Sequence, residues 1–373
     1  MPQGSPQRGA SAIGGGAMAM AFGEQHLAGG CRQGDHTMPI AICHPPRARK
    51  VAFPALPKTM RTAAIERFGG PEVLSILSLP VPVPGPGDVL IAIETAGVGG
   101  WDAEMRSGSL PSSNAKLPLV LGTDGSGHVA AVGSRVRRFH PGDAVYAYSF
   151  DNPKGGFYAE YVAVAAHQVS AVPQGLGLRE AGAIPTTGLT ALQGIDDALG
   201  VRRCESLLIL GASGGVGTLA VQFAKLRGAR LLAIASGKDG VALAHLLGAD
   251  TSIDGRREDI RAAAHQFAPE GVDALLALTG GQALEQCIDA LRHPGRLAYP
   301  NGVEPEPTKR RRIRIVPYDA VAGVKEFAHL NRAVMAAQLR VPIAAEYPLE
   351  EAAKAHQRLA EGHVLGKIVL RVR

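Results

Sequence analysis

The sequence predicts a mixed α/β protein in which an antiparallel β domain accompanies a doubly wound parallel sheet. Two observations support this prediction. The first half of the chain alternates short apolar runs with turn residues, whereas residues 207–299 alternate buried apolar runs with helical patterns. The second pattern is typical of βαβ units, whose strands lie parallel in one sheet. With 373 residues, 46% of them hydrophobic, the chain can form two or three domains.

Residues 1–59 are rich in Gly, Pro, Ala and Met and show no sustained periodicity, which predicts a disordered extension. They hold six basic and two acidic residues, so most of the net charge of +6 lies there. A strand pattern opens at Met60, which is therefore a candidate for the native start. An organelle-targeting extension is the alternative. We expect a chain that begins at Met60 to fold and to remain active.

Residues 60–185 have the pattern of the antiparallel β domain. Alternating prolines from Pro80 to Pro86 indicate an extended segment, and glycines and polar residues crowd the stretch 97–108. Turn residues such as Pro141-Gly142-Asp143 separate the expected strands. These strands are 89–95, 129–132, 144–148 and 158–164. A helical pattern over 178–192 then leads into the α/β domain.

Residues 186–324 have the pattern of the parallel-sheet domain. The expected strands are 207–210, 231–235, 272–278 and 296–299, and the expected helices are 216–224, 239–247 and 284–291. Helices at 325–338 and 349–360 and a strand at 367–372 follow. We expect this last segment, 325–373, to return to the β domain and to complete it together with residues 60–185.

A glycine-rich turn joins the first expected strand of this domain to its helix. Glycines let the backbone approach a pyrophosphate, and the helix that follows points its free N–H groups and positive dipole end at the anion. Strand, helix and second strand all fall where a dinucleotide-binding unit requires them. The residues expected to contact the cofactor are Gly211, Ser213, Gly214, Gly215, Val216 and Gly217.

The end of the second expected strand of the parallel-sheet domain, 231–235, predicts which cofactor is bound. A fold that binds NAD places Asp or Glu there, about 20 residues beyond the glycine turn, to accept hydrogen bonds from the ribose hydroxyl. This chain has Ala235-Ser236-Gly237-Lys238 instead. A hydroxyl and an ammonium can donate to a 2′-phosphate, so Ser236 and Lys238 predict NADPH. The alternative is that Lys238 only begins a solvated helix, which Asp239 caps.

Several classes of protein are disfavoured by composition. No apolar run reaches the ~20 residues of a membrane span and no secretory signal is apparent, which makes the cytoplasm the default location. The four cysteines are far apart, which argues against a zinc knuckle or a disulfide scaffold. The basic run 309–314 predicts a solvated loop, and without interleaved aromatic residues it makes nucleic acid an unlikely partner.

From Met60 onward the chain resembles the medium-chain dehydrogenase/reductase superfamily, in its zinc-independent quinone oxidoreductase-like branch. The motifs that carry the resemblance are PGPGDVLIAIETAGVG, LGTDGSGHVAAVG, GGFYAEYVAV, IPTTGLTAL, LGASGGVG, LGAD and GKIVL. The resemblance implies a GroES-like β-barrel substrate domain, an inserted Rossmann domain and a cleft between them. It also implies a homodimer.

Zinc-using relatives supply Cys, His and Cys ligands at positions that match Gly99, Thr123 and Ala183, and none of these three can bind zinc. The lobe with four closely spaced cysteines is also absent. The resemblance therefore implies a site without metal. Some quinone-reductase relatives carry Asn at the position of Gly99, and Tyr at the positions of Glu104 and Leu110, which this chain lacks.

The resemblance also assigns roles to individual residues. Thr187 and Thr190 match positions that face the nicotinamide, with a helix-start threonine as the alternative, and Lys367 matches a basic position aimed at the pyrophosphate. Thr279 and Asn301 follow two expected strands at the edge where this fold binds ligands, unless they only cap loops. The expected catalytic residues in the cleft are Trp101, Asp124 and Tyr148. Tyr148 is the expected proton donor, with a packed tyrosine of the β-barrel as the alternative.

Taken together, these features predict a zinc-independent, NADPH-dependent oxidoreductase that reduces quinones or α,β-unsaturated carbonyl compounds by hydride transfer. Such acceptors need only hydrogen-bond donors and a proton for the developing oxyanion. Two alternatives stay open. One is an NADPH-binding protein with a structural or RNA-binding role, in which the basic run contacts phosphates. The other is a metal-free alcohol dehydrogenase.

Overall fold

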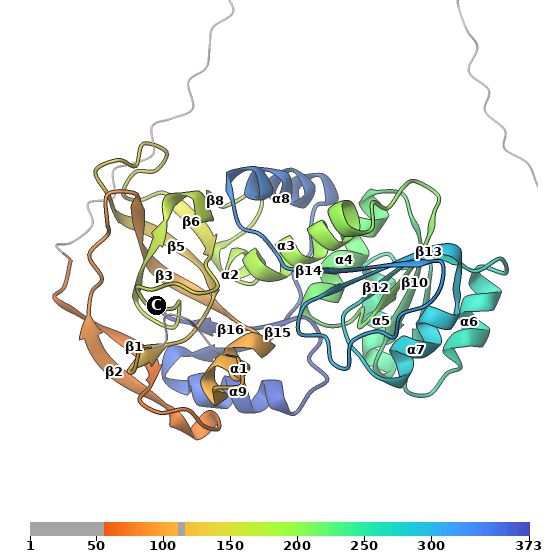
Figure 1. The fold of residues 1–373 in the computed structure, drawn as a ribbon. Coiled ribbons are helices and arrows are strands. Elements are labelled where there is room, and N and C mark those ends of the chain that lie inside the picture. Colours follow the sequence, from red (N-terminus) through yellow and green to blue (C-terminus); the bar gives the residue numbers. More distant parts are fainter. Residues whose placement is uncertain (1–55, 111–115) are drawn as a thin grey trace, which may run out of the picture. The chain divides into compact units, whose positions relative to one another are not determined.

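The computed structural model describes residues 56–110 and 116–373 (Figure 1). The expected disordered extension, residues 1–59, lies almost entirely outside the described residues. None of the helices in the described part of the chain is both long and apolar enough to cross a membrane. The fold is built on antiparallel and parallel sheets, as the sequence predicts.

The antiparallel part contains a seven-stranded sheet and a three-stranded sheet. The larger has the order β15-β16-β3-β5-β6-β8, with β7 paired to β3, and the smaller has the order β2-β1-β4. Only β15 and β16 pair in parallel. The strands are β1 Thr59–Ile65, β2 Leu74–Pro80, β3 Asp88–Val98, β4 Leu119–Val120, β5 Asp124–Val132, β6 Ala144–Tyr148, β7 Tyr161–Ala165, β8 Val169–Ala171, β15 Ile343–Pro348 and β16 Lys367–Arg371.

The parallel sheet has six strands in the order β11-β10-β9-β12-β13-β14. Counted along the chain this order is 3-2-1-4-5-6, which is that of a doubly wound dinucleotide-binding sheet. Its strands are β9 Ser206–Leu210, β10 Arg230–Ala235, β11 Thr251–Asp254, β12 Val272–Ala277, β13 Leu291–Pro300 and β14 Ile313–Tyr318. The helices between them are α4 Gly215–Leu226, α5 Gly237–Leu246, α6 Ile260–Phe267 and α7 Gln282–Asp289.

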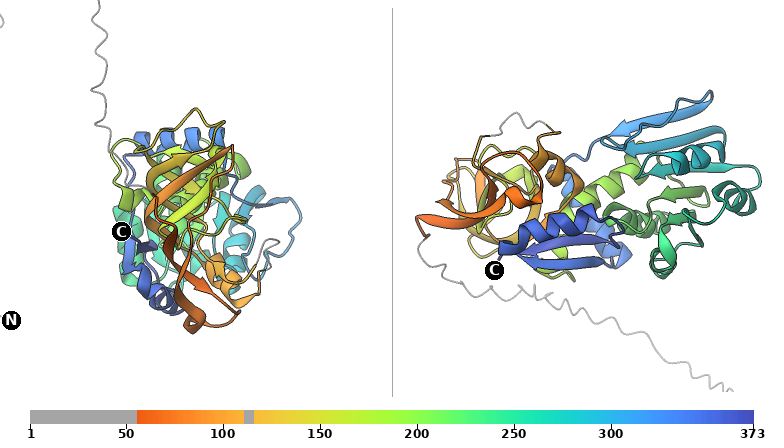
Figure 2. Two further views of the ribbon diagram at one scale, coloured as in Figure 1. Left: turned by 90° about the vertical axis from the view of Figure 1, so that its left-hand side faces the viewer. Right: turned by 90° about the horizontal axis from the view of Figure 1, so that it is seen from below.

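Strand β9 shows why its residues form a buried strand. Leu207 and Ile209 pack into a core shared with α4 and α5, while Leu208 and Leu210 pack into a second core shared with α6 and α7. Since alternate side chains point to opposite faces, a continuous apolar run covers both faces at once. Helices therefore lie on both sides of the sheet (Figure 2).

The remaining α-helices of the described residues are α1 Gly100–Ser107, α2 Leu178–Ala181, α3 Pro185–Gln193, α8 Val324–Ala337 and α9 Ala352–Ala360. Helix α8 packs against α3, α4 and β8. Its Phe327 ring meets Tyr146 of β6 edge to face, with ring centroids 5.1 Å apart. Helix α8 thus contacts both the antiparallel part, through β6 and β8, and the parallel-sheet part, through α4. The domain boundary near residue 325 stays a prediction.

Two expectations about local structure are wrong, and one stretch without an expected element forms a helix. The single helix expected over 178–192 is two helices, because Pro185 cannot continue the first and starts the second at its N1 position. The glycine-rich stretch 97–108, where no element is expected, contains α1. The Asp102 carboxylate accepts from the N–H of the N-cap residue Gly99, and the helix ends at Gly108, which is left-handed. The basic run continues into β14, which pairs with β13, so it is only partly a loop.

Candidate cofactor and active site

The glycine turn brings β9 against the start of α4. Gly211 adopts a left-handed conformation with φ of 84°. A Cβ on Gly217 would lie 2.1 Å from the Gly211 carbonyl oxygen, so only glycine fits there. No described side chain caps the N-terminus of α4. Its first N–H groups remain available, and this arrangement fits a cofactor pyrophosphate. Ser213 and Val216 lie within the same turn.

The segment before β16 crosses this turn. The Gly366 N–H donates to the Ser213 carbonyl over 2.9 Å, and Gly366 forms a β-bridge with Gly214. The next residue, Lys367, is therefore delivered to the turn. Its Cδ lies 3.6 Å from where a Cβ on Gly215 would be. The sequence match of Lys367 to a pyrophosphate-binding position agrees with this location.

Lys367 is buried, and its ammonium lacks a hydrogen-bond partner among the described residues. It lies 4.7 Å from the centroid of the Trp101 ring. A buried ammonium without a partner is costly, and a stacked indole compensates only part of the lost hydration. The position of Lys367 is therefore suited to an anionic ligand at the glycine turn.

Two buried carboxylates, those of Asp102 and Asp124, lie near the Lys367 side chain. Asp124 accepts a 3.0 Å hydrogen bond from the Thr186 N–H through Oδ2, and its Oδ1 has no partner among the described residues. A Cβ on Gly97 would contact both Asp124 Oδ1 and Lys367 Cε, so these side chains converge over Gly97. Asp102 Oδ1 is likewise unpartnered in the described structure.

Asp102 is held by the backbone and by a tyrosine. Its Oδ2 accepts from Gly99 N–H over 2.8 Å and from the Tyr158 hydroxyl over 3.3 Å. Burial raises the pKa of Asp102 from 3.8 to about 7, against the nearby Lys367 charge and these hydrogen bonds, which lower it. Asp102 can therefore take up or release a proton near neutral pH.

A histidine and an arginine orient Tyr158. Arg106 Nη1 lies 2.7 Å from His356 Nδ1, and Tyr158 Oη lies 3.2 Å from His356 Nε2. Because arginine only donates, Nδ1 must accept and Nε2 must carry the proton. His356 therefore donates to Tyr158, which is left to donate to Asp102. Burial, with the Arg106 charge, lowers the pKa of His356 to about 3, in agreement with a neutral ring.

The predicted proton donor, Tyr148, ends β6 and is largely buried. Desolvation raises the pKa of its hydroxyl, and the charges of Asp124, Asp319 and Asp102 raise it further. The hydroxyl therefore keeps its proton at neutral pH. Asp319 accepts a 2.8 Å hydrogen bond from the Asn301 amide, so Asn301 lies at the strand ends near this site.

The predicted nicotinamide-facing threonines lie on α3. Each hydroxyl donates to a carbonyl one turn earlier, Thr187 to Ala183 and Thr190 to Thr186, both over 2.8 Å. The methyl group of Thr187 lies 3.4 Å from where a Cβ on Gly215 would be, so Thr187 borders the glycine turn. The methyl group of Thr279 is equally close to a Cβ placed on Gly211.

The predicted 2′-phosphate site lies at the start of α5. Lys238 is exposed in the first turn of this helix. Ser236 Oγ lies 3.1 Å from Nδ1 of His363, and His363 Nε2 lies 2.9 Å from Asp239 Oδ2. The sequence did not indicate His363, because it lies more than 120 residues from Ser236 and only the fold brings them together.

The three positions that match zinc ligands hold no metal-binding side chains. Trp101 fills the space beside Gly99, where a Cβ would lie 2.4 Å from the indole. The indole Nε1 donates to Thr123 Oγ1 over 2.7 Å. Ala183 is buried. Nowhere in residues 56–110 and 116–373 do three or more His, Cys, Asp or Glu side chains form a group that could hold a metal.

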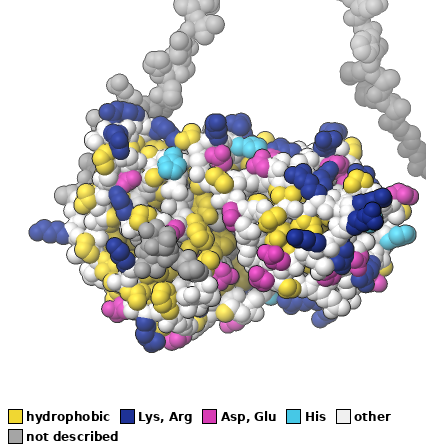
Figure 3. Space-filling view, viewed as in Figure 1, with side chains coloured by type: hydrophobic (Ala, Val, Ile, Leu, Met, Phe, Trp, Pro, Cys, Tyr) yellow, Lys and Arg dark blue, Asp and Glu magenta, His cyan; other side chains and the backbone are white. Residues whose placement is uncertain are grey.

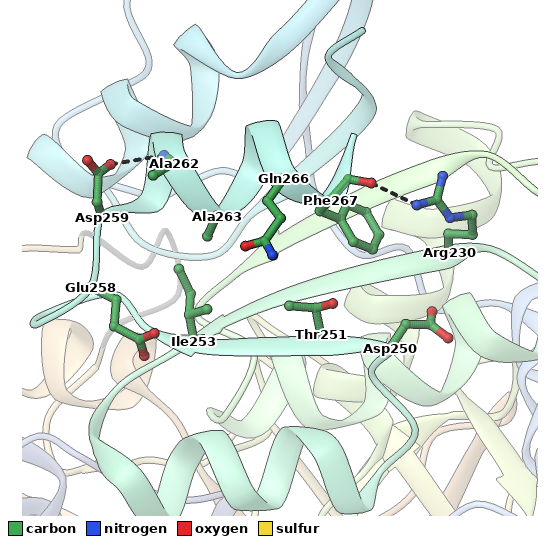
Figure 4. A pocket seen from close by; sticks show the side chains of 10 residues that line it. All are labelled: Arg230, Asp250, Thr251, Ile253, Glu258, Asp259, Ala262, Ala263, Gln266 and Phe267. Atoms are coloured by element: carbon green, nitrogen blue, oxygen red, sulfur yellow. Dashed lines mark hydrogen bonds between the residues drawn. The ribbon is translucent and has the colours of Figure 1, made fainter. Parts of the chain in front are cut away.

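A pocket of about 770 Å³ lies elsewhere, between the edge strand β11 and α6 (Figure 4). Its polar groups already serve the local structure. Asp259 caps α6 by accepting from the Ala262 N–H, and Arg230 donates to the Phe267 carbonyl. None of the predicted site residues lines it, so it is separate from the glycine turn.

The basic run is partly neutralised. Arg310 lies 2.7 Å from a Glu285 carboxylate oxygen and 3.7 Å from one of Asp289. Basic side chains gather over the parallel-sheet half on the face shown in Figure 3, with acidic side chains among them. This mixture does not favour a continuous phosphate-binding surface.

The strand order, the glycine turn and the buried cation beside it are typical of oxidoreductases in which a Rossmann sheet binds a nicotinamide cofactor. Two family models match the chain. The one described as "Alcohol dehydrogenase GroES-like domain" matches residues 85–174, and the one described as "Zinc-binding dehydrogenase" matches residues 247–370. The quinone oxidoreductase of Mus musculus is 31% identical over 329 residues, covering 84% of this chain and 98% of the mouse protein.

Solved structures agree with this relationship. A structure described as an NAD-dependent alcohol dehydrogenase matches with a TM-score of 0.78 and 34% identity, covering 84% of this chain and 100% of its own. A mycobacterial protein solved in complex with NADPH matches with a TM-score of 0.76 and 27% identity, with coverage of 84% and 100%. The chain belongs to the medium-chain dehydrogenase/reductase superfamily, in its quinone oxidoreductase-like branch. The resemblance drawn from the motifs is thereby confirmed.

We predict that Asp102→Asn removes a pH dependence of stability. The folded pKa of Asp102 is raised to about 7 from 3.8, so its stabilising contribution is complete below pH 4 and is lost as the pH rises to 7. Between pH 4.5 and 8, the wild type should lose roughly 3 kcal/mol more free energy of unfolding than the variant. Urea denaturation at both pH values measures this difference.

The matched control is Glu66→Gln, which removes an exposed carboxyl at the end of β1. It should leave the pH dependence of the wild type unchanged. If Asp102→Asn and the wild type lose the same free energy of unfolding over this pH range, Asp102 is not the group that titrates.

Proposed function

We propose that the protein is a zinc-independent, NADPH-dependent reductase of quinones or α,β-unsaturated carbonyl compounds. The observation that supports this most is the environment of Trp101. Its indole fills the space beside Gly99 and donates a hydrogen bond to the Thr123 hydroxyl. Gly99 and Thr123, two of the three positions that match zinc ligands, are therefore closed to a metal. Without a Lewis acid, an acceptor that is already activated is the better substrate.

The cofactor would lie along the residues described above. The turn from Gly211 to Gly217 and Lys367 would hold the pyrophosphate, Thr187 and Thr190 would border the nicotinamide, and Ser236 with Lys238 would hold the 2′-phosphate. Bound NADPH would supply the hydride. The chain itself orients the substrate beside Trp101 and Asp124 and excludes water from the buried charges.

A proton must reach the oxygen of the reduced substrate. Tyr148 is suited to donate a hydrogen bond to that oxygen, because its raised pKa keeps the hydroxyl protonated. Asp102, whose pKa is about 7, can hold a proton in the same buried region. Tyr158 and His356 fix the orientation of this carboxyl and do not contact the substrate in this proposal.

One alternative is supported by a specific observation. The solved structure at 34% identity is described as an NAD-dependent alcohol dehydrogenase. A metal-free alcohol dehydrogenase that uses NAD would share the same fold and glycine turn. A homodimer and a location in the cytoplasm remain expectations from the resemblance and from composition.

A substrate panel tests the proposal. The protein, dialysed against a chelator, should oxidise NADPH in the presence of 1,4-benzoquinone or a 2-alkenal. The reaction is followed as the loss of NADPH absorbance at 340 nm. Saturated aldehydes and simple alcohols should give far slower turnover, since they lack an activated acceptor carbon. Activity that appears only after zinc is added, or only as alcohol oxidation with NAD⁺, would contradict the proposal.

We predict that Lys238→Ala weakens the binding of NADPH and leaves that of NADH almost unchanged. A hydrogen bond to a charged group contributes roughly 1.5 to 3 kcal/mol, which corresponds to a loss of roughly 10 to 150-fold in Kd. Titration of cofactor fluorescence measures both constants. The control is Lys225→Ala at the far end of α4. Equal weakening of both cofactors would remove Lys238 from the 2′-phosphate site.

A further inference from the structure

His363 lies in the segment between α9 and β16 and reaches the start of α5. Its ring contacts two residues there. Nδ1 lies 3.1 Å from Ser236 Oγ, and Nε2 lies 3.0 and 2.9 Å from the two carboxylate oxygens of Asp239. One imidazole thus links the hydroxyl predicted to bind the 2′-phosphate to a carboxylate in the first turn of the same helix.

The backbone holds His363 in a conformation that few side chains adopt. Its φ is 49°, in the left-handed region. Arg358 of α9 donates to the carbonyls of both Gly362 and His363, over 2.8 and 3.2 Å. A Cβ on Gly237 would lie 2.9 Å from His363 Cε1, so the ring packs directly on the start of α5. The neighbouring structure therefore maintains this strained residue at the site.

The hydrogen-bond directions depend on the charge of the ring. Nε2 faces two carboxylate oxygens, so it carries a proton in either state. When His363 is neutral, Nδ1 can only accept, and it takes the hydroxyl hydrogen of Ser236. When His363 is protonated, Nδ1 donates to Ser236 Oγ, and the hydroxyl hydrogen becomes free for another acceptor.

The two states also differ in charge. With a neutral ring, the His363–Asp239 pair carries one negative charge beside the predicted phosphate position, which opposes the attraction of Lys238 for a phosphate. With a protonated ring, the His363 and Asp239 charges cancel. The hydrogen bond from His363 lowers the pKa of Asp239, so this carboxyl stays ionised across the range in which histidines titrate.

We infer that His363 determines cofactor specificity by coupling the binding of a 2′-phosphate to proton uptake. In its protonated state it neutralises Asp239 and frees the Ser236 hydroxyl for the phosphate. NADPH is then preferred over NADH more strongly at low pH than at high pH. The inference rests on the proposed use of NADPH, and the experiment below separates the two.

The other charged groups around His363 are Lys, Arg, Asp and Glu side chains, residue types whose unperturbed pKa values lie outside the range from pH 6 to 8. Lys238 and Asp239 come from α5, and Arg358 with its partner Glu361 comes from α9 and its end. Behind Gly237 lies Asp254, which accepts from the Gly237 N–H and has a lowered pKa with Arg256 and Arg257 nearby. His363 is therefore the group in this surrounding set that can couple phosphate binding to pH.

Calorimetric titration with NADP⁺ and NAD⁺ in two buffers of different ionisation enthalpy measures the coupled protons. At pH 7.5 the 2′-phosphate itself is almost fully ionised. Wild-type protein should take up a substantial fraction of a proton with NADP⁺ and almost none with NAD⁺. From pH 8 to pH 6, the ratio of the two Kd values should move roughly tenfold toward NADP⁺.

Two variants and one control complete the design. His363→Gln should abolish the proton uptake. His245→Gln, which changes an exposed histidine on α5, should retain it. Asp239→Asn removes an exposed carboxyl, which is safe for folding, and should tighten NADP⁺ binding at pH 8 and flatten its pH dependence.

The outcomes are distinct. If the wild type binds NADP⁺ no tighter than NAD⁺ at any pH, the proposed cofactor is wrong and the inference fails with it. If the wild type prefers NADP⁺ but shows the same proton uptake as His363→Gln, the cofactor proposal stands and the role of His363 is overturned. Unchanged pH dependence in Asp239→Asn would overturn it as well.

Discussion

The close approach of the chain at the glycine turn constrains the rest of the structure. Only 2.1 Å would separate a Cβ on Gly217 from the Gly211 carbonyl oxygen, so the first turn of α4 can lie against the end of β9 only because no side chain is present. That contact opens the N-terminus of α4 toward a ligand. The C-terminal segment crosses this turn, where Gly366 forms a β-bridge with Gly214.

This C-terminal segment links the two halves of the proposed site. Within five residues it delivers His363 to the start of α5 and Lys367 to the glycine turn, and then continues as β16 in the antiparallel sheet. The buried Lys367 faces Asp102 and Asp124, and all three side chains retain an atom without a partner in the described structure. Such unsatisfied charges are rare in folded proteins and indicate a function that requires them.

The sequence predicted the four central strands of the parallel sheet, because each is a local apolar run, but it missed the two edge strands β11 and β14. The resemblance singled out Lys367 for the pyrophosphate and Thr187 for the nicotinamide, and both side chains lie close to Gly215 of the glycine turn. It could not predict the Arg106, His356, Tyr158 and Asp102 chain of hydrogen bonds. Arg106 and His356 are 250 residues apart, and no local pattern connects them. The break between α2 and α3, in contrast, could have been predicted from Pro185, which begins α3.

We propose that the Lys367 ammonium is buried without a hydrogen-bond partner among the described residues because it binds the cofactor pyrophosphate. The most direct test is the Kd of NADPH and NADH for Lys367→Met, which keeps the apolar length of the side chain. Lys354→Met, an exposed lysine on α9, is the control. Both cofactors should bind the Lys367 variant roughly 10 to 150-fold more weakly, since both carry the same pyrophosphate. Unchanged binding of both cofactors in a folded variant would contradict the account.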